Sequence, residues 1–216
     1  MQVNIKSNVK EFKKGLTSVQ KKQIPFATSR ALNLTGVLVL KGLGSKANRT
    51  FAGGATPSTM RALKPPKGMK GTRPNIRFST KRDLTTSVFL PQWAANYLKY
   101  QIDGGLRSVG GKGTGVPTPN KRLNKFGNIP GRKGATKDPS KLIKGKNQFI
   151  ATIKGIDGVW ERYGRKGANV RLLIAFEKNV NYRKKFTYYE TATHMAKTHF
   201  NRKMKLELNK ALRNAK

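Results

Sequence analysis

Paired carboxylates are the first residues in this chain that could do chemistry, because two of them together can hold a metal ion that activates water, as in metal-dependent nucleases. The chain has nine acidic residues, and Asp157 and Glu161 are the pair that could meet across a turn. The other acids are scattered, and most have basic neighbours. Local salt bridges at strand ends therefore explain Asp157 and Glu161 better than a metal site does.

The histidines and the glycine-rich segments offer no better site. His194 and His199 are five residues apart, so on one helix they point in different directions and cannot share a metal ion with i, i+4 geometry. Gly111-Lys112 fails the phosphate-loop pattern because Gly113 follows where Ser or Thr is required. The chain has no cysteine, which excludes thiolate metal ligands and a cysteine nucleophile. We therefore expect no catalytic residue, no metal and no cofactor, and a protein that is not an enzyme.

Positive charge is the most informative property of the sequence. The 216 residues include 46 Lys and Arg against 9 Asp and Glu, a net charge of +37. Charge this high repels itself unless an anionic partner is near, and phosphates or an acidic protein surface would both serve. The basic residues are spread along the whole chain, which is typical of a protein inside a polyanionic assembly such as a ribosome, a chromatin particle or a virion.

No membrane or export signal is visible in the sequence. The N-terminal residues lack the hydrophobic stretch of a signal peptide. The longest apolar run, Val37–Leu40, is far below the roughly 20 residues that a bilayer span requires. We therefore expect a protein that is made in a cytoplasm, with no membrane partner.

Helical periodicity predicts helices at both ends of the chain. Apolar residues spaced by three and four predict one helix within 6–23 and a second over 25–42, which Gly42 and Gly44 should end. The same spacing predicts the longest uninterrupted helix over 185–212. Two shorter helices are expected, over 57–63 and 93–100.

Alternating and β-branched runs predict strands between these helices. Five of them are expected, over 76–81, 84–90, 148–154, 158–163 and 170–176. The first two should form a hairpin that turns near Arg82-Asp83. Together the five predict a sheet of four or five strands.

Residues 104–146 differ in composition from the rest of the chain. They are rich in Gly, Pro and basic residues, with Phe126 as the single aromatic. Such a segment buries too little apolar surface to order itself, so we expect a long basic loop that is ordered by contact with a partner. Without interleaved aromatics it should touch nucleic-acid backbones rather than bases. The expected contact residues are Lys121, Arg122, Lys125, Arg132 and Lys133.

The predicted fold class is α+β: N-terminal helices and a long C-terminal helix pack on a small, mostly antiparallel sheet that carries a long basic Gly-rich loop. We expect a single domain over 1–216. Its parts would be N-terminal helices over 1–44, a sheet with the C-terminal helix over 75–103 and 147–216, and the extended loop over 104–146. Four aromatic residues are expected to anchor the core: Trp160, Tyr182, Phe186 and Tyr189.

Three short stretches give the sequence a family resemblance. They are Tyr97-Leu-Lys-Tyr-Gln-Ile-Asp-Gly-Gly105, Gly158-Val-Trp-Glu-Arg-Tyr-Gly164 and Tyr182-Arg-Lys-Lys-Phe-Thr-Tyr-Tyr-Glu190. They follow Arg30-Ala-Leu-Asn33 and a Thr56-Pro-Ser-Thr59 turn, where the family pattern has phenylalanine in place of Ser58. With this order over roughly 25–212, the chain resembles the minor tail protein Z family of tailed bacteriophages, the tail completion proteins.

The resemblance implies a structural virion protein, a tail completion or neck subunit at the head–tail junction. It implies copies of the chain in a ring with portal, adaptor or tail proteins as partners, synthesis in the host bacterial cytoplasm, and no active site. It also allows sequence-independent contact with DNA. A nucleic-acid-binding protein of a ribosomal or chromatin-like assembly stays open as the alternative, because charge alone fits both, and a metal-dependent nuclease is the third and least favoured function.

Overall fold

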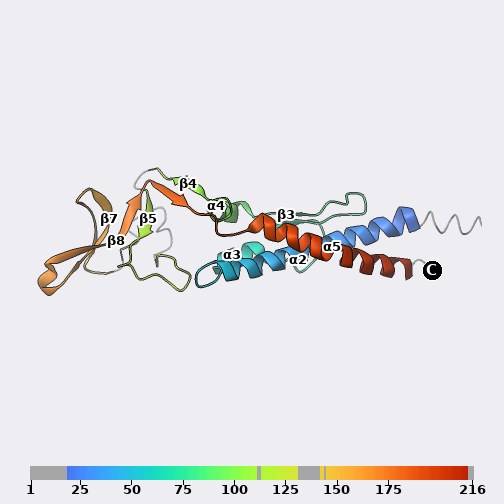
Figure 1. Ribbon diagram of the computed structural model, residues 1–216, viewed down its shortest axis with the longest axis horizontal. Helices are drawn as coiled ribbons and strands as arrows, with labels where there is room; N and C mark the ends of the chain where they lie inside the picture. Colours follow the sequence, from blue (N-terminus) through green and yellow to red (C-terminus); the bar gives the residue numbers. More distant parts are fainter. Residues whose placement is uncertain (1–18, 111–112, 131–141, 144, 214–216) are drawn as a thin grey trace, which may run out of the picture. The chain divides into compact units, whose positions relative to one another are not determined.

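The computed structural model describes residues 19–110, 113–130, 142–143 and 145–213 (Figure 1). The chain divides into two compact units. Unit 1 comprises Met1–Lys46, Pro57–Ala95 and Thr187–Lys216, and unit 2 comprises Ala47–Thr56 and Asn96–Phe186. We describe each unit by itself. Helices combined with antiparallel sheets confirm the α+β class.

Unit 1 is mainly helical. After the π-helical turn η1 (Val19–Gln23), its elements in chain order are α2 (Ile24–Thr50), α3 (Pro57–Leu63), β1 (Thr72–Arg73), β2 (Ile76–Arg77), β3 (Ser87–Val88), α4 (Gln92–Ile102) and α5 (Tyr188–Arg213). Helices α2 and α4 each cross the boundary between the units. The strands form a three-stranded antiparallel sheet in the order β1-β2-β3. The helices expected over 57–63, 93–100 and 185–212 are thereby confirmed, whereas the helix expected within 6–23 lies mostly outside the described residues.

Helix α2 continues past the two glycines that were expected to end it. A Cβ on Gly42 would lie 2.8 Å from Met195 on α5, so the missing side chain leaves room for the neighbouring helix. The expected end was wrong because glycine lowers helix propensity by only about 1 kcal/mol, which packing can offset. The helix ends instead just before Gly53 and Gly54, whose φ angles of 69° and 88° are left-handed and suit glycine.

Buried polar side chains attach the chain around Ser79 to α2. The Asn33 side chain donates from Nδ2 to the Ser79 carbonyl at 3.1 Å, and its Oδ1 accepts from the Ser79 backbone N–H at 2.8 Å. Oδ1 also accepts from Thr86 Oγ1 at 2.7 Å. Beside this network Leu40 packs with Ile76 and Phe78. The segment between β2 and β3 is thus held by hydrogen bonds to one face of α2 rather than by a long strand ladder.

Unit 2 is built on antiparallel strands. They are β4 (Gly105–Ser108), β5 (Thr114–Pro117), β6 (Gln148–Ile153), β7 (Ile156–Tyr163), β8 (Asn169–Glu177) and β9 (Asn179–Tyr182), with the 3₁₀ turn η3 (Arg165–Gly167) between β7 and β8. A four-stranded sheet has the order β5-β8-β7-β6, and β4 pairs with β9 in a separate two-stranded sheet. Val159, Leu173 and Ile174 form the buried core of the larger sheet together with Leu142.

Two expectations about strands need correction. The expected runs 76–81 and 84–90 do pair as a hairpin, but through β2 and β3 of unit 1, and they are not part of the sheet that contains β6–β8. The expected basic loop 104–146 contains β4 and β5, which pair with β9 and β8. Composition alone missed these strands because they order by backbone pairing to distant partners that supply the apolar surface.

The expected aromatic anchors divide between core and surface. Phe186 is fully buried and its ring lies 5.6 Å from that of Phe51, and Trp160 is also buried. Tyr182 is half-buried. Tyr189 is 61% exposed, so its assignment to the core was wrong. Its neighbour Tyr188, which lies about 100° away around the helix, is buried instead, and burial raises its pKa to about 12.

Candidate functional site

The basic segment that follows β5 is anchored to the four-stranded sheet. The Thr118 N–H donates to the Leu173 carbonyl at 3.0 Å, and Thr118 Oγ1 donates to the Leu172 carbonyl at 2.7 Å. Asn120 Nδ2 reaches the same Leu172 carbonyl at 3.1 Å. Further along, Ile129 packs against the core of the sheet. The segment over 118–130, which we call the basic segment, is therefore an integral part of unit 2.

A hydrogen-bonded turn from Asn124 to Asn128 within the basic segment carries Lys125. The Asn124 N–H donates to the Asn128 carbonyl and the Gly127 N–H to the Asn124 carbonyl, both at 2.9 Å. Asn124 Oδ1 accepts from the N–H groups of Phe126 and Asn128 at 2.9 and 3.0 Å. Gly53 packs so closely on the Lys125 carbonyl that no Cβ would fit there. These contacts fix the backbone on which Lys125 stands.

The structure describes three of the five predicted contact residues. Arg122 and Lys125 are exposed, and Lys121 is half-buried at the turn that starts at Thr118. The Lys125 ammonium lies 5.0 Å from the Phe126 ring, within cation–π range. Arg132 and Lys133 lie outside the described residues. The structure thus brings Lys121, Arg122 and Lys125 onto one ordered segment, and their role in partner contact stays a prediction.

Glu161 is held by hydrogen bonds on the sheet. Arg171 Nε donates to its carboxylate at 2.9 Å and Gln148 Nε2 at 3.2 Å. These hydrogen bonds, that from Arg171 first, outweigh the opposing effect of burial, and the positive charge of Lys121 adds to them, so the pKa of Glu161 is lowered. Asp157 accepts a hydrogen bond from Thr152. Each carboxylate thus has its own partner, as the salt-bridge interpretation expected for Glu161.

No group of three potential metal ligands gathers among the described residues. His194 and His199 both lie on α5, exposed and half-buried respectively. The Thr198 hydroxyl donates to the His194 carbonyl at 2.8 Å, a local contact within the helix. The histidines thus occupy ordinary helix positions.

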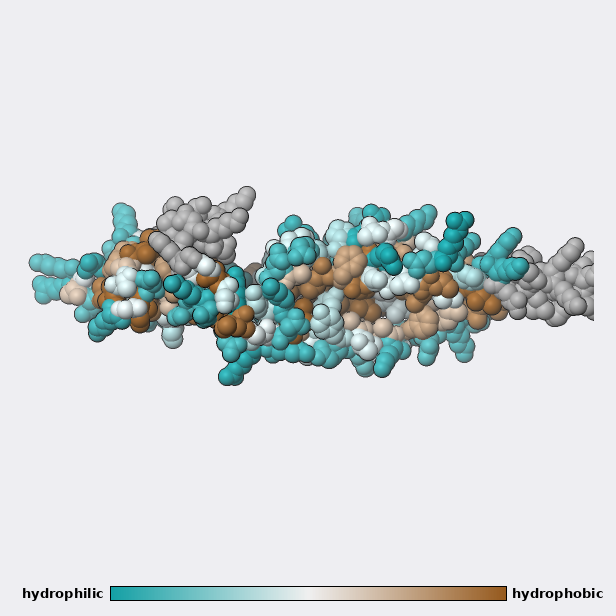
Figure 2. Space-filling model, turned by 90° about the horizontal axis from the view of Figure 1, so that it is seen from above, coloured by the Kyte–Doolittle hydropathy of each residue, from teal (hydrophilic) through white to brown (hydrophobic). Residues whose placement is uncertain are grey.

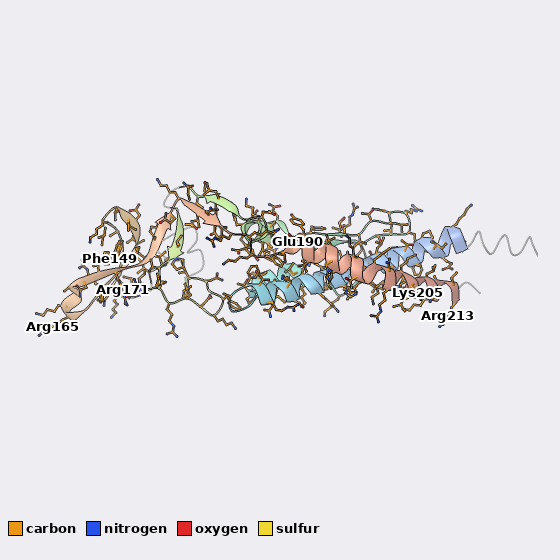
Figure 3. All side chains as sticks on the ribbon, in the orientation of Figure 1. Phe149, Arg165, Arg171, Glu190, Lys205 and Arg213 are labelled. Atoms are coloured by element: carbon orange, nitrogen blue, oxygen red, sulfur yellow. The ribbon has the colours of Figure 1, made fainter. Side chains whose placement is uncertain are left out.

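The hairpin between β7 and β8 carries cations that the sequence analysis did not single out. Arg162 lies 5.1 Å from the Phe149 ring, and Arg171 lies 5.2 Å from the Tyr163 ring. Figure 3 shows Arg165 at the outer end of this hairpin. The signal that could have revealed it is Gly164-Arg-Lys-Gly167 between two strand-like runs, because glycines at both ends of a short basic stretch are typical of a hairpin turn.

A pocket of about 370 Å³ also lies in unit 2, where β5 and β8 meet the basic segment. Arg107 is the charged side chain among its lining residues, and it lies 5.8 Å from the Tyr100 ring. Apolar and polar groups line the rest: Gly113, Thr114, Gly115, Pro117, Gly127, Asn128, Ile129, Leu142, Phe176 and Tyr182. One guanidinium in a mixed lining does not by itself define a ligand.

The stretches Tyr97–Gly105 and Tyr182–Glu190, far apart in the sequence, meet in unit 2. The Gln101 carbonyl accepts from the backbone N–H groups of Lys185 and Phe186, both at 2.8 Å. The rings of Tyr100 and Tyr182 lie 5.5 Å apart. Gly104 has a φ of 75°, and a Cβ there would lie 3.1 Å from the Tyr182 carbonyl. We call this contact the α4–β9 junction; it is made by backbone bonds and aromatic packing.

The fold and these contacts define an α+β protein whose ordered surface in unit 2 is basic. No family model matches the chain, and no curated protein or solved structure matches it either. None of the helices in the described part of the chain combines the length and hydropathy of a membrane span.

Proposed function

We propose that this protein is a structural virion protein of a tailed bacteriophage, a tail completion or neck subunit at the head–tail junction. In this role copies of the chain assemble with one another and with portal, adaptor or tail proteins. Its residues act by contact and not by catalysis. Its site of action would be the assembled virion, after synthesis in the host cytoplasm.

The observation that carries the proposal is the α4–β9 junction. The stretches Tyr97–Gly105 and Tyr182–Glu190 resemble a phage family in sequence although they lie far apart in the chain. In the fold, Gln101, Tyr100 and Gly104 of the first contact Tyr182, Lys185 and Phe186 of the second. Residues that meet in a junction of backbone hydrogen bonds and aromatic packing serve the architecture of the fold, which agrees with a structural subunit.

Exposed apolar side chains in unit 1 support assembly with other proteins. Trp93, Leu206 and Leu212 are 46%, 43% and 44% exposed, and Tyr189 is 61% exposed. Brown, hydrophobic surface is visible among teal side chains in Figure 2. Large apolar and aromatic side chains at a surface are typical of residues that protein–protein interfaces bury.

Electron microscopy of particles from a phage that lacks the gene for this chain tests the proposal. We expect filled heads separate from tails, or heads that have lost their DNA. Restoring the gene from a plasmid should restore joined, infectious particles, which controls for effects on neighbouring genes. Normal joined virions without the gene would overturn the proposal.

The net charge of +37 also favours an alternative to the neck role, a nucleic-acid-binding protein of a ribosomal or chromatin-like assembly. That function predicts tight RNA binding by the isolated protein, with an affinity that falls steeply as salt rises. A purified chain that prefers structured RNA to duplex DNA at equal salt would favour this alternative over the neck role.

A further inference from the structure

The turn between β7 and β8 holds two basic residues at its apex. The strand pairing ends at Tyr163 and Asn169, and the turn closes with bonds from the N–H groups of Gly167 and Ala168 to the carbonyls of Gly164 and Arg165. Lys166 has a φ of 53°, a left-handed conformation that costs a non-glycine residue about 1 kcal/mol. Arg165 and Lys166 are both exposed there.

Two guanidinium groups flank this apex on opposite faces of the ribbon. Adjacent residues of a strand point to opposite faces, so Arg162 lies on one face and Glu161, with its cross-strand partner Arg171, on the other. Each guanidinium lies over an aromatic ring, Phe149 for Arg162 and Tyr163 for Arg171. Stacking restricts a guanidinium while leaving its edge N–H groups free to donate.

The outer end of the hairpin, from Glu161 to Arg171, has four basic residues against one acid, whereas Asp157 and Glu177 lie at its inner end. Glu161 neutralises Arg171 through an ion pair of 2.7 Å. No ion pair of the described residues involves Arg162, Arg165 or Lys166. Hydrophilic side chains cover the hairpin end of unit 2 in Figure 2. Three unneutralised cations on a hydrogen-bonded ribbon form a positive surface of fixed geometry, which we call the basic hairpin.

The shape of the basic hairpin favours duplex DNA among polyanions. The major groove of B-DNA, about 12 Å wide, admits a two-stranded β-ribbon, whereas the major groove of an A-form RNA helix is too narrow. The rings of Phe149 and Tyr163 are each covered by a guanidinium, which disfavours stacking with the bases of single strands.

The geometry points to the β7–β8 hairpin as a DNA-binding element: Arg162, Arg165 and Lys166 contact the phosphates of duplex DNA without reading its sequence. This goes beyond the neck role, because it assigns a ligand to residues outside the basic segment. It does not depend on that role, because binding by the purified chain is measured without the virion.

The test measures binding of the purified full-length chain to a fluorescent duplex by anisotropy over a range of NaCl concentrations. The variant is Arg165→Ser with Lys166→Ser, and the matched control removes the same charge from exposed positions of α5, Arg202→Ser with Lys205→Ser. Losing two phosphate contacts should reduce the slope of log K against log [salt] by about 1.8 and weaken binding about 30-fold at 0.15 M NaCl. The control should stay within about 2-fold of the unchanged chain.

A second variant tests whether weaker binding could result from unfolding of the turn rather than from loss of charge. Lys166→Gly removes one charge and suits the left-handed conformation better than lysine does, so this chain should fold at least as stably. It should bind the duplex about 5-fold more weakly at 0.15 M NaCl, with a slope smaller by about 0.9. Equal losses of duplex affinity in the hairpin and α5 variants would overturn the proposal. It would also be overturned if the unchanged chain bound single-stranded DNA, RNA or an acidic protein more tightly than the duplex, and if the hairpin variant, but not the α5 variant, weakened that binding.

Discussion

The two units of this protein use polar groups in opposite ways. In unit 1 polar side chains are buried and hold elements together: Asn33 bonds to Ser79, and Glu207, only 4% exposed, accepts from Arg30 at 2.7 Å. Among the described residues of unit 2 the buried side chains are apolar, and the corresponding ion pair of Glu161 with Arg171 lies at the surface of a sheet. In the described part of unit 2 acids are scarce, and basic side chains outnumber them.

The net charge of this protein and the number of its cations that stand on ordered backbone are separate properties. Lys125 stands on a turn closed by Asn124, and Arg162 stacks on Phe149. A solvated cation on a flexible loop loses conformational entropy when it binds, whereas a cation on a fixed backbone loses less. Cations of unit 2 that stand on hydrogen-bonded backbone are therefore expected to bind an anionic partner more tightly than the same number of cations on a flexible loop.

The largest expected effect is loss of the buried polar network in unit 1. Asn33→Ala would leave the backbone N–H and carbonyl of buried Ser79 without their Asn33 partner. The Ser79 carbonyl would keep its bond from Ser29 and the Ser79 N–H its bond to Thr86. We expect the free energy of unfolding to fall by about 2–4 kcal/mol, because the four hydrogen bonds of the Asn33 side chain are lost and each contributes about 0.5–1.5 kcal/mol. Urea unfolding followed by circular dichroism measures it. The control Asn209→Ala, at an exposed position on α5, should change the free energy of unfolding little. Equal losses in the two variants would refute the claim that buried polar groups hold unit 1 together.

A smaller fall in the free energy of unfolding is expected when a side chain is added to the four-stranded sheet of unit 2. A Cβ on Gly158 would collide with the Ile174 carbonyl and with Leu172 on β8. Gly158→Ala should therefore destabilise the chain by about 1–3 kcal/mol through overpacking. Gly110→Ala is the matched control, since a Cβ there meets nothing within 4 Å. A tolerated Gly158→Ala would mean that β7 and β8 do not approach as closely as described.

The smallest effect is the acid dependence of the Glu207 ion pair. Burial alone would raise the pKa of Glu207, but hydrogen bonds from Arg30 and Lys210 outweigh it and hold the pKa below its ordinary value. The unfolded chain therefore takes up the proton first, and this stabilisation is present at neutral pH and lost as pH falls below about 4.5.

Glu207→Gln tests this dependence. The variant should lose about 1 kcal/mol at pH 7 and should show a flatter fall in stability between pH 5 and 3 than the unchanged chain. Urea melts over that pH range measure both. Identical pH profiles for the two chains would show that the ion pair does not stabilise unit 1.

Local signals were enough to predict α3, α4 and α5, because a signal such as the Thr56-Pro57 cap of α3 or the apolar spacing of α5 lies at or within the element itself. They failed at Gly42, where the deciding neighbour is Met195 on another helix, and at β5, where Gly115 pairs with Phe176 about 60 residues later. The positive charge of the candidate surface could be predicted from composition. The identity of the cations that lie on ordered backbone could not be predicted, because it depends on strand register.

The contacts of the basic segment imply that it is folded without a partner. Hydrogen exchange of the purified chain alone, read by mass spectrometry or NMR, tests it most directly. The amide N–H groups of Thr118, Gly127 and Asn128 each donate a hydrogen bond, so we expect them to exchange at least about 100-fold more slowly than in an unstructured peptide. Exchange at the unstructured rate in the free chain, with protection only after DNA or protein is added, would contradict the claim and restore the partner-ordered loop.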